Sequence, residues 1–132
     1  MSQLMEPADL AFVAMEARER PMHVGGLQVF TPPDDAGDDF LRNAYQVAVG
    51  AGAELHPLLS RRLGRTPVVG KLRWDEDDDI DLTYHVRHSG LPRPGNQGQL
   101  SEVVSRLHGT LLDRNRPLWE AHLIEGLDDG RF

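Results

Sequence analysis

The sequence predicts an α/β fold in which helices and strands are mixed along one chain. Apolar residues recur every three or four positions across residues 100–111, which is the spacing of a helix that buries one face. Across residues 80–87, by contrast, apolar and polar residues alternate, as in a half-buried strand. The third observation is the "DDG" of residues 128–130, which follows an apolar run and is typical of a tight turn between two strands.

The first thirty residues predict a helix and then a strand. Pro7 suits a first helical turn, and apolar residues then repeat at helical spacing until Pro21 stops the pattern. Residues 23–30 favour a strand, in which the pair Gly25-Gly26 marks a bulge or a close approach of another backbone.

A second helix is expected over residues 40–51, where apolar side chains recur at helical spacing. Asp38 or Asp39 is expected to begin it with a carboxylate cap. Residues 56–65 leave two alternatives open, a short helix or an irregular basic segment. The remaining predicted elements are strands over residues 68–74 and 80–87, a helix over residues 100–111, and a strand over residues 118–124.

The composition excludes several classes of function. With 132 residues and 39% hydrophobic content the chain has the length of one domain. The net charge of −7 disfavours nucleic acid as a partner, because binding to phosphates draws on clustered positive charge. Without any cysteine there can be no disulfide, thiolate metal ligand or cysteine nucleophile, which fits a cytoplasmic location. An export signal has basic residues followed by an apolar run, but acidic Glu6 and Asp9 lie there, so no such signal is expected. Since no apolar run is long enough to span a membrane, any membrane contact is expected to be peripheral.

Two groups of residues suggest a metal site, and neither pattern is complete. Asp75, Asp77 and Asp79 resemble the start of a calcium loop, but the required glycine and glutamate are replaced further along. His85 and His88 would point to opposite faces of a strand, so they cannot easily share one ion. We therefore expect no metal. Arginines and a lysine are also clustered and could meet phosphates or an anionic lipid surface, although ordinary surface charge is favoured; they are Arg61, Arg62, Arg65, Lys71 and Arg73.

Four stretches taken together carry a resemblance that covers nearly the whole chain: "MEPADLAFVAMEAR", "EARERPMHVGGLQVF", "DDDIDLTYHVRHSGLPRPG" and "LSEVVSRLHGTLLDRNRPLWEAHLIEGLDDGRF". They resemble the amino-terminal part of the bacterial wax ester synthase/acyl-CoA:diacylglycerol acyltransferase family. The resemblance implies the fold of chloramphenicol acetyltransferase and other CoA-dependent acyltransferases. It predicts that residues 1–132 are part of one half-domain, an incomplete mixed sheet with flanking helices.

The resemblance also implies the site. Family members carry a His-His-x-x-x-Asp-Gly motif whose second histidine acts as general base, but no two histidines are adjacent here, so no catalytic residue is assigned. Pro117, Leu118 and Trp119 match another family motif and are expected to bind substrate by supporting its tunnel. A structural alternative stays open, in which the proline starts a strand while the leucine and tryptophan pack on opposite faces.

The function implied is O-acyl transfer from acyl-CoA, a substrate rather than a bound cofactor, to diacylglycerol or a long-chain alcohol. The enzyme is expected to lie peripherally at the cytosolic face of the inner membrane. We further expect the strand after "DDG" and the carboxy-terminal half to lie beyond Phe132, and the 132-residue chain alone to be inactive and prone to associate. The alternatives are a non-catalytic module that binds lipid or protein, or an enzyme of the same fold with another acceptor.

Overall fold

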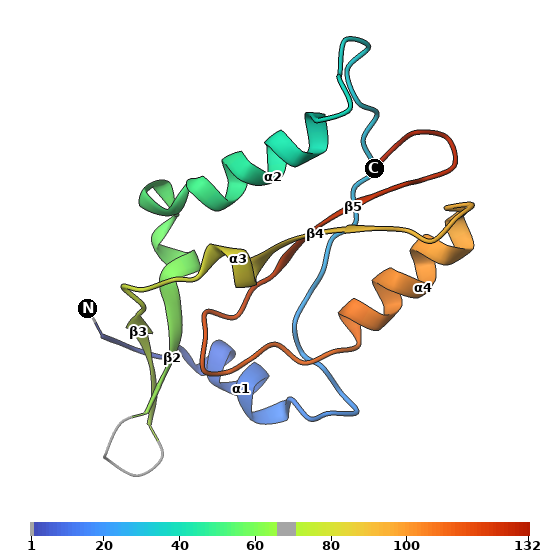
Figure 1. The fold of residues 1–132 in the computed structure, drawn as a ribbon. Coiled ribbons are helices and arrows are strands. Elements are labelled where there is room, and N and C mark those ends of the chain that lie inside the picture. Colours follow the sequence, from blue (N-terminus) through green and yellow to red (C-terminus); the bar gives the residue numbers. More distant parts are fainter. Residues whose placement is uncertain (1, 66–70) are drawn as a thin grey trace. The chain divides into compact units, whose positions relative to one another are not determined.

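The computed structural model describes residues 2–65 and 71–132, which form two compact units, each made from three separate parts of the chain. The first unit comprises Met1–Val24, Ala53–Ile80 and Thr110–Trp119, and the second comprises Gly25–Gly52, Asp81–Gly109 and Glu120–Phe132. Figure 1 labels most of the helices and strands along the chain. Helices and strands are mixed in both units, as the sequence predicts.

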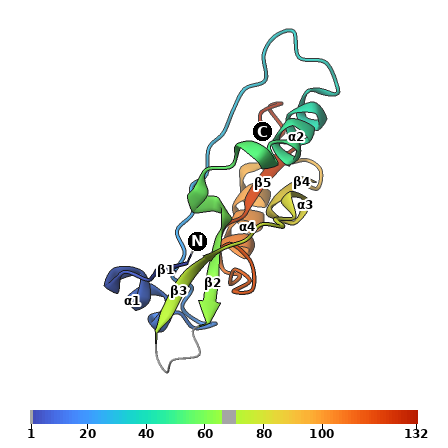
Figure 2. The same ribbon diagram turned by 90° about the vertical axis from the view of Figure 1, so that its left-hand side faces the viewer.

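The first unit contains a three-stranded antiparallel sheet in the order β1-β3-β2. Its strands are β1 (Gln3–Leu4), β2 (Arg61–Arg65) and β3 (Leu72–Glu76), and Figure 2 shows them side by side next to helix α1 (Pro7–Met15). Trp74 of β3 lies opposite Leu63 of β2 and Gln3 of β1. The predicted strand over residues 68–74 is thus present from Leu72 onward, and its first part lies outside the described residues.

Residues 56–65, for which the sequence left two alternatives, contain both a short helix and a strand. The 3₁₀ helix η2 (Pro57–Ser60) begins with Pro57, and the ring nitrogen Nδ1 of His56 accepts a hydrogen bond from the N–H of Leu58 at 3.2 Å. The chain then enters β2 directly. A second 3₁₀ turn, η1 (Gly52–Glu54), precedes this segment.

The second unit is built around two parallel strands, β4 (Val86–Gly90) and β5 (Ala121–Glu125), which pair from Val86 opposite Ala121 to Gly90 opposite Glu125. Figure 1 shows the two strands side by side. Helix α2 (Phe40–Gly50) packs on both strands, and α4 (Gln97–His108) lies between them in the chain. The core is small: Leu82 and Leu100 are its buried hydrophobic residues among those described, together with His85.

Helix α4 confirms the clearest prediction of the sequence, although it spans Gln97–His108 instead of residues 100–111, and it has a complete amino-terminal cap. The Asn96 side chain accepts a hydrogen bond from the N–H of Gln99, and the Gln99 side chain accepts one from the N–H of Asn96, both at 2.9 Å. These contacts satisfy backbone donors that a helix start leaves without partners. Helix α2 is confirmed as well, but its predicted carboxylate cap is wrong, because the Asp39 carboxylate pairs with Arg42 at 3.0 Å and bonds no backbone N–H.

Two predicted strands are wrong in whole or in part. Residues 23–30 form no strand, and Val24 and Leu27 are exposed, because no strand among the described residues pairs with this segment. Residues 82–85 form the short helix α3 (Leu82–His85), since the Asp81 side chain accepts hydrogen bonds from the N–H groups of Thr83 and Tyr84 and caps a helical turn. The strand begins only at Val86.

The final strand is confirmed but displaced, since it spans Ala121–Glu125 instead of residues 118–124. The predicted turn follows it, with the N–H of Gly130 bonded to the carbonyl of Leu127 and Gly130 at a φ of 81°. The chain after the turn does not return along β5. Phe132 instead exchanges two backbone hydrogen bonds with Phe30, of 2.7 and 3.0 Å, and their rings stack. Among the described residues Phe132 thus pairs with the amino-terminal part, and the strand expected beyond Phe132 stays a prediction.

Candidate functional site

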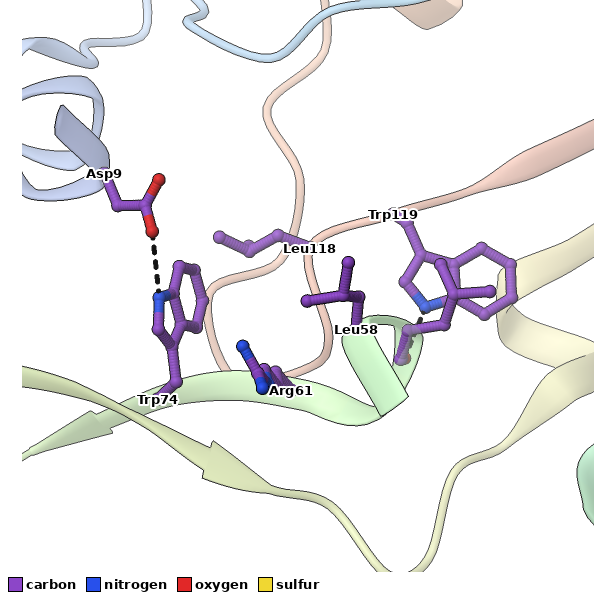
Figure 3. A pocket seen from close by; sticks show the side chains of 7 residues that line it. Asp9, Leu58, Arg61, Trp74, Leu118 and Trp119 are labelled. Atoms are coloured by element: carbon purple, nitrogen blue, oxygen red, sulfur yellow. Dashed lines mark hydrogen bonds between the residues drawn. The ribbon is translucent and has the colours of Figure 1, made fainter. Parts of the chain in front are cut away.

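A pocket of about 220 Å³ lies within the first unit and gathers side chains from α1, η2, the sheet and the segment before β5. It is lined by Asp9, Leu58, Leu59, Arg61, Trp74, Leu118 and Trp119. Figure 3 shows the two indoles at either end of this group, with Leu58 and Leu118 between them. The lining is mainly apolar with two charged residues, Asp9 and Arg61, and the hollow is open and smaller than the roughly 300 Å³ at which small-molecule sites usually begin.

Two of the three residues predicted to bind substrate line this pocket. Leu118 and Trp119 both face it, while Pro117 is buried beside them. The alternative in which Leu118 and Trp119 pack on opposite faces of a strand is wrong, because the strand starts only at Ala121. Their role in substrate binding stays a prediction.

Each indole at the pocket is fixed by a hydrogen bond. The Trp119 Nε1–H group donates to the carbonyl oxygen of Leu59 at 2.7 Å, which joins the segment before β5 to η2. The Trp74 Nε1–H group donates to Oδ2 of Asp9 at 3.2 Å, which joins β3 to α1. Both rings are therefore oriented by partners far away in the sequence, so the pocket is a product of tertiary structure.

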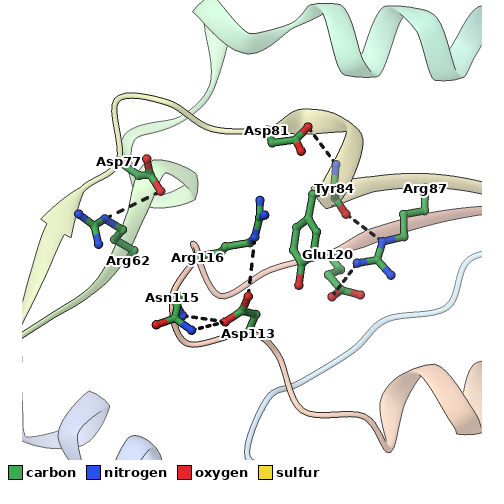
Figure 4. A network of polar contacts seen from close by, with 9 residues as sticks. All are labelled: Arg62, Asp77, Asp81, Tyr84, Arg87, Asp113, Asn115, Arg116 and Glu120. Carbon is green, nitrogen blue, oxygen red and sulfur yellow. Dashed lines mark hydrogen bonds and ion pairs between the residues drawn. The ribbon is translucent and has the colours of Figure 1, made fainter.

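The segment before the pocket is shaped by a local turn around Asp113 (Figure 4). The Asp113 carboxylate accepts hydrogen bonds from the backbone N–H and the side-chain amide of Asn115, at 2.9 and 3.0 Å. Arg116 lies 3.7 Å from the same carboxylate. The Asn115 backbone N–H is the main reason that the pKa of Asp113 is lowered, with further contributions from the Asn115 amide and Arg116.

The basic cluster of the sequence divides in the structure. Arg61 lines the pocket, whereas Arg62 lies 3.9 Å from Asp77 and Arg73 lies 2.8 Å from Asp75. The acidic run thus neutralises part of the cluster, which favours the expectation of ordinary surface charge. The sequence analysis assigned neither Trp74 nor Asp9 to a site. Trp74 could have been found because it is the only tryptophan besides Trp119, whereas no local pattern marks Asp9.

Two histidines of the second unit, His88 and His122, pair with carboxylates. His88 on β4 lies 2.9 Å from Glu125 on β5, and His122 lies 2.9 Å from Glu120. Arg87 approaches Glu120 at 3.5 Å, and its guanidinium lies 4.8 Å from the centre of the Tyr84 ring (Figure 4).

His85 belongs to α3, so the expected separation of His85 and His88 across one strand does not apply. Its ring lies edge-on to that of Tyr84, with ring centres 5.1 Å apart, and the residue is buried. Across residues 2–65 and 71–132, no three side chains that could ligate a metal ion come together. In the same residues no helix has the length and apolar character that crossing a bilayer requires.

The sequence model of the wax ester synthase/diacylglycerol acyltransferase catalytic domain matches residues 5–132. The chain belongs to this family. The family match confirms the resemblance seen in the sequence, and it spans the segments that line the pocket: α1, η2, β2, β3 and the pair Leu118-Trp119.

Individual relatives of the family agree. The chain is 49% identical over 130 residues to a Mycobacterium tuberculosis H37Rv protein named "Probable diacyglycerol O-acyltransferase tgs2", covering 98% of this chain and 28% of that protein. It is 39% identical over 129 residues to the O-acyltransferase WSD of Acinetobacter baylyi, covering 97% of this chain and 27% of that protein. This chain therefore spans just over a quarter of the length of the curated relatives that it matches.

A solved structure of the family gives the fold. The wax ester synthase/diacylglycerol acyltransferase from Marinobacter aquaeolei VT8 superposes with a TM-score of 0.90 and 40% sequence identity, over 98% of this chain and 31% of that one. The expected acyltransferase fold, with mixed helices and small sheets, is thereby confirmed.

Proposed function

We propose that this chain is part of an enzyme that transfers a fatty acyl group from acyl-CoA to the hydroxyl of diacylglycerol or of a long-chain alcohol. The observation that carries the proposal is the family match over residues 5–132, since relatives in that family are named for these two activities. The hydroxyl oxygen attacks the thioester carbonyl, its proton passes to a general base, and CoA leaves as the thiol.

The catalytic base is not assigned to any histidine of this chain. The family motif has two adjacent histidines, and none of the six histidines here has a histidine neighbour. His88 and His122 each pair with a glutamate at 2.9 Å. The first pair joins β4 to β5, and the second joins His122 of β5 to Glu120, which precedes the strand. We therefore propose that residues 1–132 supply binding surface and that the 132-residue chain alone does not turn over substrate.

For the pocket we propose contact with the apolar part of a substrate. Leu58, Leu118 and Trp119 provide apolar surface, and burying a methylene group against such surface is worth about 0.8 kcal/mol. Pro117 is proposed to support the two side chains that follow it. Arg61 and Asp9 are the charged residues of the lining and suit polar groups better than an alkyl chain.

We also propose that the enzyme works at the cytosolic face of the inner membrane and is bound there peripherally. Diacylglycerol and long-chain alcohols partition into membranes, so an enzyme that uses them benefits from lying at the lipid surface. In α1 the side chains of Leu10, Phe12 and Met15 are exposed, which offers apolar surface for such contact. Flotation with anionic vesicles tests this, and loss of flotation in Phe12→Ser is the expected result.

The decisive experiment for the activity has two parts, reading the gene beyond Phe132 and measuring acyl transfer. Reading the gene beyond the codon for Phe132 is expected to show adjacent histidines followed by Asp-Gly. The complete gene product is expected to convert labelled palmitoyl-CoA and diolein or hexadecanol to triacylglycerol or wax ester, resolved by thin-layer chromatography. The 132-residue chain is expected to give no product. A monomeric 132-residue chain with measurable turnover would overturn the assignment, and a stop codon after Phe132 would favour a lipid-binding role.

A further inference from the structure

The carboxyl end of helix α1 is completed by arginines from elsewhere in the chain. The last turn of α1 contains no basic residue, although its free carbonyl groups favour positive charge. The Arg20 Nε–H group donates to the carbonyl of Met15 at 2.9 Å, and Arg114 Nη2 donates to the carbonyl of Val13 at 2.8 Å. Arg114 lies 101 positions after Val13, so it links distant parts of the first unit.

The same arginine binds the residue that ends the helix. Oε1 of Glu16 accepts hydrogen bonds from Nη2 and Nε of Arg114, at 3.1 and 3.3 Å. Oε2 of Glu16 accepts one from the backbone N–H of Met22 at 3.2 Å, and the Glu16 side chain is only 13% exposed. A planar guanidinium can make the carboxylate and carbonyl contacts together, whereas the ammonium of a lysine is a point charge.

The Arg114–Glu16 pair connects two segments that line the pocket, helix α1 and the segment before β5. Helix α1 carries Asp9, which fixes the Trp74 indole, and the segment that contains Arg114 continues into Leu118 and Trp119. The local turn at Asp113 makes that segment a defined connection between Arg114 and the pocket. The Arg114–Glu16 contact therefore joins the helix that bonds the Trp74 indole to the segment that carries Trp119.

We propose that Arg114 and Glu16 are positioning residues that set the separation between α1 and the segment carrying Leu118 and Trp119, and so determine which apolar chains the pocket accepts. The substrate class rests on the proposed function, whereas the positioning rests on the contacts alone. Neither residue lines the pocket, so each acts through the side chains that do.

Tryptophan fluorescence tests the proposal directly, because Trp74 and Trp119 are the only tryptophans of the chain and both line the pocket. The variants are Arg114→Ala, Arg114→Lys and Glu16→Gln. The matched control is Arg42→Ala, which also removes an arginine–carboxylate pair, between Arg42 and Asp39 on the exposed surface of α2. Far-UV circular dichroism shows whether each variant is folded.

Two readouts follow the pocket in these variants. Tryptophan emission reports on the indoles themselves, and energy transfer from tryptophan to cis-parinaric acid reports on occupancy by a fatty acyl chain. Arg114→Ala and Glu16→Gln are expected to shift the emission to the red and to weaken probe binding about threefold to tenfold, the range for a charged hydrogen bond discounted for exposure. Arg114→Lys is expected to restore little of the parent chain's emission or probe binding. Arg42→Ala is expected to leave both readouts unchanged.

The outcomes separate the positioning role from the proposed function. A folded Arg114→Ala or Glu16→Gln with the emission of the parent chain would overturn the positioning role. Full recovery by Arg114→Lys would overturn it too, since the two simultaneous contacts would then be unnecessary. If Arg114→Ala does not fold, Glu16→Gln decides. A parent chain that fails to bind cis-parinaric acid counts against the substrate class and the proposed function, while the emission spectra still decide the positioning.

Discussion

Replacing Trp119 with phenylalanine removes the hydrogen bond to the Leu59 carbonyl and keeps an aromatic ring at the pocket. The bond is short, at 2.7 Å, and partly buried, so its loss leaves an acceptor that water reaches poorly. A net hydrogen bond contributes about 0.5 to 1.5 kcal/mol, and an unsatisfied acceptor adds to the loss. We expect Trp119→Phe to lower the free energy of unfolding by about 1 to 2 kcal/mol.

Trp74→Phe is the matched control, because it makes the same change of ring. Its bond to Asp9 is longer, at 3.2 Å, and exposed to solvent, so its loss should cost about 0.5 kcal/mol beyond the shared change of ring. The assay is urea unfolding followed by far-UV circular dichroism, at several protein concentrations so that association is detected. A Trp119→Phe loss no larger than that of Trp74→Phe would refute the reasoning, since the Leu59 contact would then not fix the pocket wall.

Three further changes test other parts of the structure. Leu100→Ala should lower the free energy of unfolding by about 2 to 3 kcal/mol in chemical denaturation, because Leu100 is 8% exposed within a small core. Asp81→Ala should remove the cap of α3 and cost about 1 kcal/mol in the same assay, whereas Asp78→Ala should cost almost nothing. The pKa of the Asp113 carboxyl, measured by NMR titration, should lie below 3.8 because the Asn115 N–H bonds its charged form, and a midpoint at or above 3.8 would contradict this contact. Since the folded pKa is the lower one, the stabilisation is complete above pH 3.8 and is lost as the pH falls through the folded value.

The predicted helices agree with the structure because their signals are local. The spacing of apolar residues marks α2 and α4, and the Asn96–Gln99 pair that caps α4 lies within four consecutive residues. Helix α1 is confirmed but ends at Met15, before Pro21, because Glu16 takes an extended backbone conformation, and arginines outside the helix bond to its final carbonyls. That contact depends on distant parts of the chain and leaves no periodic signal.

The strand predictions were weaker because a strand is defined by its partner. The alternation over residues 80–87 also fits a short capped helix followed by β4, and the Asp81 side chain selects the helix. Residues 23–30 have the composition of a strand but form no ladder with a described strand; only Phe30 pairs, with Phe132. The turn at residues 128–130 is confirmed, and the strand expected beyond Phe132 stays a prediction.

The sequence by itself determined the mixture of helices and strands, the positions of the main helices, the family, and the motif Pro117-Leu118-Trp119. Periodicity and caps act over a few residues, and a family likeness is carried by the order of residues along the chain. Only the tertiary structure brought Asp9 and Trp74 together with Leu118 and Trp119, and placed Arg114 at the end of α1. The hydrogen bonds from Trp74 to Asp9 and from Arg114 to Val13 join residues 65 and 101 positions apart, and no local pattern encodes so long a separation because it arises only when the chain packs.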